Sequence, residues 1–348
     1  MLSRLNLPAV CRLLVIEFLL LMIASPVIRA AEIDSVTTRR VTLENSRADI
    51  NRIFNQRIER GIDEANRKRI GIHRVGDLEL YREGEYCDEQ LLYRELRKAI
   101  FESNTATWGL KGYHIDLQLR GLLAGKSYSL PLNDSIYRDI DYLEGISLNL
   151  KELSDLVQVD GVLIGVDKLG HFFAEGWRYF EMVAFDDKSL YDALAWGREK
   201  ESGLFGYSTT GIFSYADLVA NFNGMRFWNR VLLKQDDPLS GVIANLLARP
   251  YVTCAIQIID SFKAGEVVKA WETGSEFDIG EYIDAGWDEG NNCNSYADPL
   301  IEAKVAKRVR DVDPDFECPS LKAACSRSRV KYGEYARFLL HPSCLSAE

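Results

Sequence analysis

The sequence predicts a mainly α protein, with a helical bundle-like core followed by a disulfide-stapled, loop-rich C-terminal region. Two observations support this fold class. Apolar residues recur with helical spacing in several segments of the first two thirds of the chain. Five of the six cysteines that follow the N-terminal region lie in the last third. We therefore expect a helical domain over residues 31–235 and a cysteine-rich region over 236–348, with a soft boundary at 235–238.

Residues 1–30 have the pattern of a secretory signal peptide. Arg4 and Arg12 precede an apolar run from Leu13 to Ile28, and small residues follow at Ala30 and Ala31. The run is short for a membrane span, so we expect cleavage near Ala30. The mature protein is then periplasmic or secreted, with no transmembrane span after signal removal. Retention of the segment as a membrane anchor is the alternative.

An even number of cysteines in an exported chain favours disulfides. The mature chain has six, and we expect them to be oxidised, with the earliest one either joining the others or tying the early helices to the tail. The six cysteines are Cys87, Cys254, Cys293, Cys318, Cys325 and Cys344. Their spacing leaves the pairing open, and the absence of a Cys-x-x-Cys pair argues against a structural zinc site.

The formal net charge of −10 is negative, and removal of the basic signal makes the mature chain more so. Nucleic acids and anionic membrane surfaces reward a basic patch. The charge therefore argues against both as main partners, and we expect no nucleic-acid partner.

Helical periodicity predicts a first helix over 42–68, with a buried stripe formed by Ile50, Phe54, Ile58 and Ile62. A second is expected over 88–103, and a short alternating piece over 113–119 indicates a strand. Further helices are expected over 148–157, 162–185 and 189–200, and from Ser214 to residue 233. Ser189 and Ser214 are the expected N-caps of the last two. The acidic stretch 276–289 is interpreted as a solvated face.

Two polar ladders carry the functional prediction. Asp167, His171 and Glu175 follow one another at four-residue steps, which places them on one face of a helix. Lys168 and Arg178 share that sector. An amphipathic surface helix gives the same pattern, so the first ladder alone does not decide between a site and a surface.

The second ladder consists of Asp217 and Asn221, again four residues apart. They share a sector with Ala220, Gly224 and Trp228, away from Asn223 and Arg230 on the hydrophilic side. A carboxylate and an amide on a packed face need polar partners. We therefore expect the two helices to pack side by side, with Gly224 permitting close approach and His171 within hydrogen-bonding reach of Asp217 or Asn221.

The ordered pair Asp167-Lys168-x-x-His171-Phe172 and Ser214-x-x-Asp217-x-x-Ala220-Asn221-x-x-Gly224 resembles the signature of VanZ-like envelope proteins and the related YfiM-like family. The resemblance covers about 60 of the 348 residues. It implies a shared helical site and an envelope setting. In that signature a glutamate lies between the halves, and Glu199 and Glu201 are the candidates here.

One hypothesis is a hydrolase or transferase acting on an envelope lipid or glycan. Asp167 would orient His171 as general base, and Asp217 or Glu175 would be the opposing acid or electrostatic stabiliser. Lys168, Arg178 and Asn221 would bind the substrate, with the two cations holding a phosphate. No cofactor is required, although a divalent metal bound by Asp167, His171, Glu175 and Asp217 is an alternative.

The second hypothesis is a non-catalytic envelope protein. Its polar ladders would lock two helices together, and its stapled tail would bind a periplasmic protein. Buried polar networks often specify packing rather than catalysis. The sequence leaves both hypotheses open.

Overall fold

The computed structural model describes residues 32–68, 70–75, 78–83, 87–101, 111–150, 153–203, 206–259 and 266–346. The predicted signal peptide lies outside these residues. Helices dominate the described chain, and its strands form two-stranded pairs. The predicted mainly α fold class is confirmed.

In the first half of the chain the structure describes two long helices, three shorter α-helices, two 3-10 helices and two hairpins. In order these elements are η1 (Thr37–Arg40), α2 (Arg47–Lys68), β1 (Ile70–Val75), β2 (Leu78–Glu83), α3 (Glu89–Phe101), α4 (Lys111–Leu122), η2 (Leu132–Asp134), α5 (Ile146–Leu150), β3 (Leu156–Val159), β4 (Val162–Gly165) and α6 (Val166–Ala184).

The second half adds the partner of α6, a long hairpin and a group of C-terminal helices. These elements are α7 (Leu190–Ser202), β5 (Ile212–Phe213), α8 (Tyr215–Leu232), α9 (Val242–Leu246), β6 (Val252–Ile259), β7 (Glu266–Thr273), η3 (Ile279–Glu281), η4 (Ala285–Trp287), β8 (Ser295–Tyr296), α10 (Pro299–Val312), α11 (Lys322–Tyr332), η5 (Gly333–Tyr335), α12 (Ala336–Leu339) and α13 (Pro342–Leu345).

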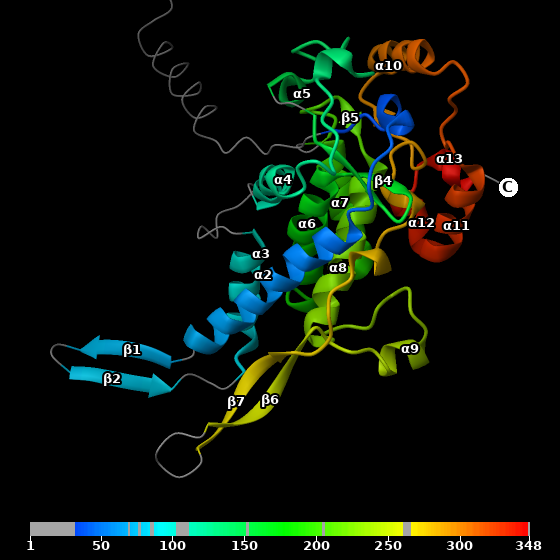
Figure 1. Cartoon of the computed structure of the whole chain (residues 1–348). Coiled ribbons are helices and arrows are strands. Elements are labelled where there is room, and N and C mark those ends of the chain that lie inside the picture. Colours follow the sequence, from blue (N-terminus) through cyan, green and yellow to red (C-terminus); the bar gives the residue numbers. More distant parts are fainter. Residues whose placement is uncertain are drawn as a thin grey trace, which may run out of the picture.

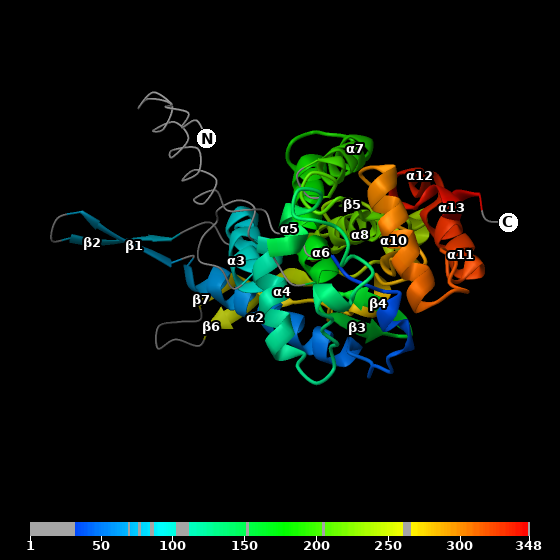
Figure 2. The same ribbon diagram turned by 90° about the horizontal axis from the view of Figure 1, so that it is seen from above.

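Helices α6 and α8 pack side by side at the centre of the molecule (Figure 1). Hairpin β1–β2 projects from one end, and α10 to α13 lie at the opposite end, as Figure 2 shows from above. An added Cβ at Gly224 would overlap the carbonyl oxygen of Phe172, and one at Gly176 would lie 2.5 Å from the Cα of Gly224. The expected close approach at Gly224 is therefore confirmed, and Gly176 is its counterpart on α6.

Aromatic residues fill the space around this helix pair. The rings of Phe54 on α2 and Phe173 on α6 have centroids 4.1 Å apart, and the indole Nε1 of Trp228 donates to the carbonyl of Phe173 at 2.9 Å. The predicted stripe on α2 is buried along its whole length. Burial of such side chains supplies most of the favourable free energy of folding.

Both predicted serine caps are present. Ser189 and Asp192 form a reciprocal capping box at the start of α7. The Ser214 side chain accepts from the backbone N–H of Asp217 at the start of α8. The helix from Ser214 is however buried on nearly every side, so the expected hydrophilic side is wrong at Asn223. That amide is buried and donates to the hydroxyl of Tyr332 at 2.9 Å.

The expected strand over 113–119 is wrong, because this segment lies within α4. The alternation of Ile115, Leu117 and Leu119 suggested a strand. In the helix Ile115 and Leu119, four residues apart, are buried, whereas Leu117 is 45% exposed. Tertiary packing against α6 selects the helical period.

The expected helices over 148–157 and 162–185 are wrong in part, because hairpin β3–β4 separates α5 from α6. Asp160 and Gly161 form its turn with φ of 49° and 84°. Two successive positive φ angles define the turn that matches the twist of paired strands, and Asp-Gly is a preferred sequence for it. The hairpin delivers the chain directly to the first turn of α6.

The expected disulfides are confirmed, with the pairs Cys87–Cys254, Cys293–Cys318 and Cys325–Cys344. The first ties the segment before α3 to β6, which was one of the two expected roles of Cys87. The long β6–β7 hairpin at this junction was not expected from the sequence.

The main hydrophobic core takes residues from both sides of the expected boundary at 235–238. Phe54, Phe172 and Trp228 pack in the same cluster as Phe277 and Trp287. A smaller second cluster lies beneath α10. Within the described residues, no helix has both the length and the apolar run that a membrane crossing requires.

We predict that Gly224→Ala destabilises the protein by about 3 kcal/mol or more, because the new methyl group forces α6 and α8 apart. The matched control is Gly121→Ala in α4, where an added Cβ meets nothing within 4 Å. There we expect no loss, or a gain of about 0.5 kcal/mol. Urea unfolding of both variants measures the difference, and equal stabilities would show that the helix contact tolerates a side chain.

Candidate functional site

Helix α6 places Asp167, Lys168 and His171 on its buried side, beginning in its first turn. The backbone N–H of Asp167 donates to the Ser154 hydroxyl at 3.0 Å, and that hydroxyl donates to Asp116 of α4 at 2.9 Å. These bonds, together with hairpin β3–β4, fix where the helix starts. They therefore set the position of every polar side chain on its first two turns.

Lys168 is the centre of the site. Its ammonium is 0% exposed and lies 2.7 Å from Asp167 Oδ2, 2.6 Å from Asp217 Oδ1 and 2.6 Å from Glu289 Oε1. We call these four residues the lysine cluster. Burial alone would lower the pKa of Lys168, but the surrounding carboxylates outweigh it and hold that pKa well above its usual value. The lysine is thus a permanent cation at neutral pH.

His171 lies beside the lysine cluster. Its Nε2 is 3.2 Å from Asp217 Oδ2, and its Nδ1 is 3.2 Å from Asn221 Oδ1. The expected contact of His171 with the second ladder is therefore confirmed for both residues. Burial lowers the pKa of His171, but Asp217 and Glu175 raise it further, to a value above that of free histidine. An imidazolium fits this setting because it donates through both nitrogens to two acceptors.

The two cations hold Asp217 in its ionised form. Burial would raise the pKa of Asp217, but His171 and Lys168 lower it below its usual value. Asp167 differs, because burial raises its pKa and Lys168 offsets only part of that effect. Two carboxylates within reach of one ammonium therefore differ in their affinity for a proton.

Acid groups outnumber cations around the lysine cluster. Burial, together with nearby carboxylates, raises the pKa of Glu32 and of Glu201 well above the usual range. Glu201 accepts from the backbone N–H of Ser214 at 3.0 Å, and Glu32 accepts from the Thr210 hydroxyl at 2.7 Å. A buried excess of carboxyl groups is stable only if several carry protons. The crowding of buried carboxyl groups therefore favours the protonated forms of Glu32 and Glu201.

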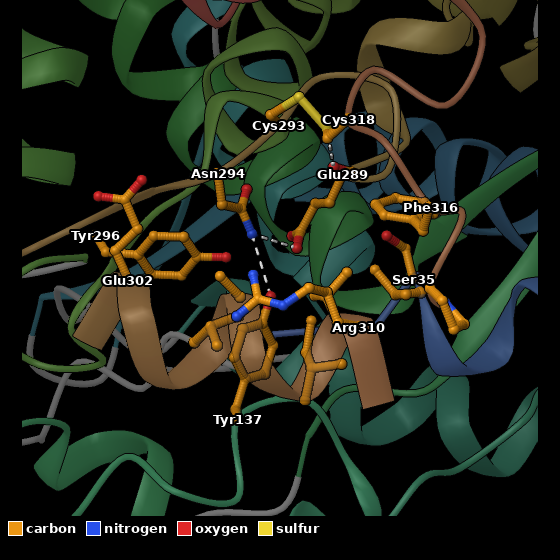
Figure 3. Close-up of a pocket in the computed structure, with 16 residues that line it drawn as sticks. Ser35, Tyr137, Glu289, Cys293, Asn294, Tyr296, Glu302, Arg310, Phe316 and Cys318 are labelled. Carbon is orange, nitrogen blue, oxygen red and sulfur yellow. Dashed lines mark hydrogen bonds between the residues drawn. A yellow bond between two sulfur atoms is a disulfide. The ribbon is translucent and has the colours of Figure 1, made fainter. Parts of the chain in front are cut away.

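Glu289 connects the lysine cluster to a cavity of about 380 Å³ (Figure 3). Its Oε2 accepts from the amide of Asn294 at 2.7 Å, on the side away from Lys168. Burial, together with Asp217 and Asp167, raises the pKa of Glu289 to about 7 against the opposing effect of Lys168. Glu289 therefore exchanges its proton near neutral pH, at the wall of a cavity.

Local hydrogen bonds hold Glu289 in place. The neighbouring Asp288 accepts from the backbone N–H of Gly290 at 2.8 Å and from Arg39 at 2.7 Å, which folds the chain back on itself. Strands β5 and β8 then pair and bring this segment beside the start of α8.

The expectation of a solvated acidic face over 276–289 is wrong for most of its carboxylates. Asp288 and Glu289 are buried. Asp278 binds Arg47 and Asn51 of α2, and Asp284 accepts from Lys331 at 2.6 Å and from Tyr332 at 2.5 Å. The charge of the sequence predicted that these carboxylates are exposed to solvent. In the structure they bind residues that are distant in sequence.

Among the remaining predicted site residues, Glu175 lies at the edge of the site. Its Oε2 is 3.8 Å from His171 Nδ1, and its side chain is 21% exposed. The structure does not bring Arg178 to the lysine cluster, because the guanidinium binds Glu181 at 2.6 Å and Asp186 at 3.1 Å. Of the two glutamates between the motifs, Glu201 lies in the site, whereas Glu199 is exposed.

A metal ion is the alternative occupant of the site. One ligand atom from each of Asp167, His171 and Asp217 lies within 4.8 Å of the others, and among the described residues Asp167 Oδ1 has no hydrogen-bond partner. This donor set suits zinc, manganese or iron. However, the Lys168 ammonium already contacts both carboxylates and would repel a second cation. The geometry favours the lysine as the cation of the cluster.

Sequence reasoning missed Glu289, Glu32 and Asp116. Glu32 and Asp116 come from segments that carry no motif, and Glu289 ends the acidic stretch 276–289 that was interpreted as a solvated face. The only available signal was indirect, since a buried lysine in the first ladder requires more carboxylates than the two ladders supply.

Comparisons of the chain with protein-family models, with curated proteins and with solved structures find no match. The resemblance of the two motifs to VanZ-like proteins therefore stays a prediction.

We predict that Lys168→Met destabilises the protein by about 3–5 kcal/mol at pH 7, because Asp167 and Glu289 lose their buried cation and Asp217 keeps only His171. The loss should shrink at pH 5, where those carboxyls take up protons. Lys304→Met is the matched control, since the partly exposed Lys304 binds Glu144 and should contribute about 1 kcal/mol or less. Denaturant unfolding at both pH values tests this, and a pH-independent loss would contradict the role of Lys168 as a counter-ion.

The Glu289 carboxyl should make stability depend on pH. Between pH 4.5 and about 7 the folded state keeps a proton on Glu289 that the unfolded chain has released, so stability falls as pH rises. Glu289→Gln removes this effect, and its stability should fall less steeply than that of wild type, by up to about 1.4 kcal/mol per pH unit. Unfolding at pH 5, 6, 7 and 8 measures the slopes. Glu199 is exposed, so the stability of Glu199→Gln should depend on pH as that of wild type does. If the stability of Glu289→Gln also changes with pH in parallel with wild type, the raised pKa of Glu289 is refuted.

Proposed function

We propose that this protein is an exported envelope hydrolase or transferase that uses Glu289 as a general acid and base. The observation that carries this proposal is a carboxyl group with a pKa of about 7 at the wall of a ligand-sized cavity. A catalytic acid works best when its pKa lies near the working pH. Export to the periplasm or beyond is supported by the three disulfides and by the pattern of residues 1–30.

In the proposed reaction, protonated Glu289 donates its proton to the oxygen of the leaving group as the bond to that oxygen breaks. The Lys168 ammonium, 2.6 Å from Glu289 Oε1, stabilises the carboxylate that forms. The oxygen of a water or hydroxyl group then forms a new bond to the atom that has lost its leaving group and passes its proton to Glu289, so the enzyme ends in its starting state. The same group thereby serves as acid and as base.

Asp167, Asp217 and His171 act as positioning residues in this scheme. Asp217 and Asp167 hold the Lys168 ammonium from two sides, while His171 binds the second oxygen of Asp217. His171 as an imidazolium does not fit the general-base role first expected for it. Its charge instead keeps Asp217 ionised, which keeps the ammonium fixed toward Glu289.

The substrate is proposed to be an envelope glycan rather than a phosphate-bearing lipid. Lys168 contacts three carboxylates, and Arg178 contacts two, so neither of these cations is free for a phosphate group. The phosphate-binding roles first expected for both residues therefore have no support in the geometry.

The second candidate function is a non-catalytic envelope protein in which the polar groups lock helix packing. The close contact of α6 and α8 at Gly176 and Gly224, bridged by His171 and Asn221, favours it. Such a lock requires the charges to balance, because each unpaired buried charge weakens it. The surplus of carboxyl groups around Lys168 is the reason to rank this candidate second.

We predict that Glu289→Gln lowers turnover of isolated cell-wall glycan by about 10²-fold or more, which is the usual effect of losing a general acid. Release of reducing ends or of soluble fragments is the measurement. The free energy of unfolding at pH 7 should stay unchanged or rise, because a neutral amide replaces a costly buried carboxyl. Glu199→Gln should keep wild-type turnover. Full activity of Glu289→Gln would reject the catalytic proposal, and a large loss of stability without any turnover in wild type would favour the structural one.

A further inference from the structure

The cavity beside Glu289 has a polar floor and apolar walls. It lies between α10, the segment that precedes η1 and the Cys293–Cys318 disulfide (Figure 3). Its volume of about 380 Å³ is in the range of small-molecule sites. The apolar walls consist of Val36, Ile136, Val305, Ala306, Val309, Pro314 and Phe316.

The polar groups converge on one side of the cavity. The Asn294 amide donates to Glu289 at 2.7 Å and to the hydroxyl of Tyr137 at 3.3 Å. Tyr137 accepts this bond, and among the described residues no acceptor takes its own proton. Tyr296 adds a second hydroxyl to the lining, as Figure 3 shows. Carboxyl, amide and phenol groups together offer both donors and acceptors, without a concentration of positive charge.

The charged groups that line the cavity nearly balance. Glu289 lies at its floor and Glu302 at its rim, with the exposed Arg310 as the cation among the residues that line it. Burial and the carboxyls of Glu289, Glu32, Asp34 and Glu302 raise the pKa of Tyr296, so its phenol stays neutral. The lining has no cluster of cations that would bind a phosphate or carboxylate group, so the cavity favours a neutral ligand.

We propose that this cavity binds a neutral sugar ring, with its hydroxyl groups toward Glu289, Asn294 and Tyr137 and its C–H face toward the apolar walls. The inference rests on the proposed function and names the substrate class of the same site. A sugar suits the cavity because its hydroxyl groups can form hydrogen bonds with the polar groups. The C–H face of the ring is then buried against the apolar walls, away from water. Glu289 then lies against an oxygen of the bound ring, where a proton can be transferred.

The test is calorimetric titration of the full mature protein with N-acetylglucosamine trimer and, as a charged comparison, N-acetylglucosamine 6-phosphate. The half-buried Ala306 lines the cavity, so Ala306→Trp should fill it and weaken binding of the trimer by about 10-fold or more. Ala303→Trp is the matched control, on the same helix but exposed and outside the lining. Tyr137→Phe removes only a hydroxyl group and should weaken binding by about 5-fold.

Binding of the trimer that is lost in Ala306→Trp and kept in Ala303→Trp, together with weaker binding of the 6-phosphate, supports the proposal. Equal binding by Ala306→Trp and wild type, tighter binding of the phosphate, or no binding of the trimer at about 10 mM would overturn it. Glu289→Gln separates this proposal from the proposed function. Binding that persists in Glu289→Gln with turnover equal to that of wild type would reject the catalytic role and leave the sugar site standing.

Discussion

The ion contacts of one buried ammonium organise this protein. Lys168 lies on α6, and its three carboxylate partners come from α6 itself, from α8 and from the segment after η4. Removing a lysine ammonium from water has a large free-energy cost, which is offset only if all of its partners are correctly placed. The glycine contact between α6 and α8, the Asp160–Gly161 turn and the Asp288 hydrogen bonds all serve to place them. The fold and the site therefore depend on the same few atoms.

Local spacing could predict half of this arrangement. The four-residue steps from Asp167 to His171 and from Asp217 to Asn221 predicted two polar helix faces. Because buried polar groups need partners, the same residues also predicted that these two faces contact each other. The position of Glu289 could not be predicted, because it depends on a chain reversal at Asp288 and on the pairing of β5 with β8 across more than 80 residues. The strand expected over 113–119 failed for a related reason. The apolar residues of this segment do alternate, but the packing of α4 against α6 favours the helical period.

The catalytic and structural explanations make opposite use of the same groups. A network that only locks helices would approach electrical neutrality, as His171 and Lys168 do with Asp167 and Asp217. The carboxyl groups in excess of the cations are Glu32, Glu201 and Glu289, and all three have raised pKa values. Ionised groups at the helix contact, together with a carboxyl of raised pKa at the cavity, are what acid–base chemistry requires.

The pattern of the disulfides bears on how the chain matures. Among the described residues, each bridge joins cysteines that are neighbours in chain order, with sequence separations of 167, 25 and 19 residues. When the N-terminus of the chain emerges first, its thiols become accessible in this same order. An oxidase that links each thiol to the next one to arrive would make the native set directly, with no reshuffling of wrong pairs. The long first interval means that Cys87 stays unpaired while the helices carrying both polar ladders emerge, so these two helices can pack before the first covalent bond forms.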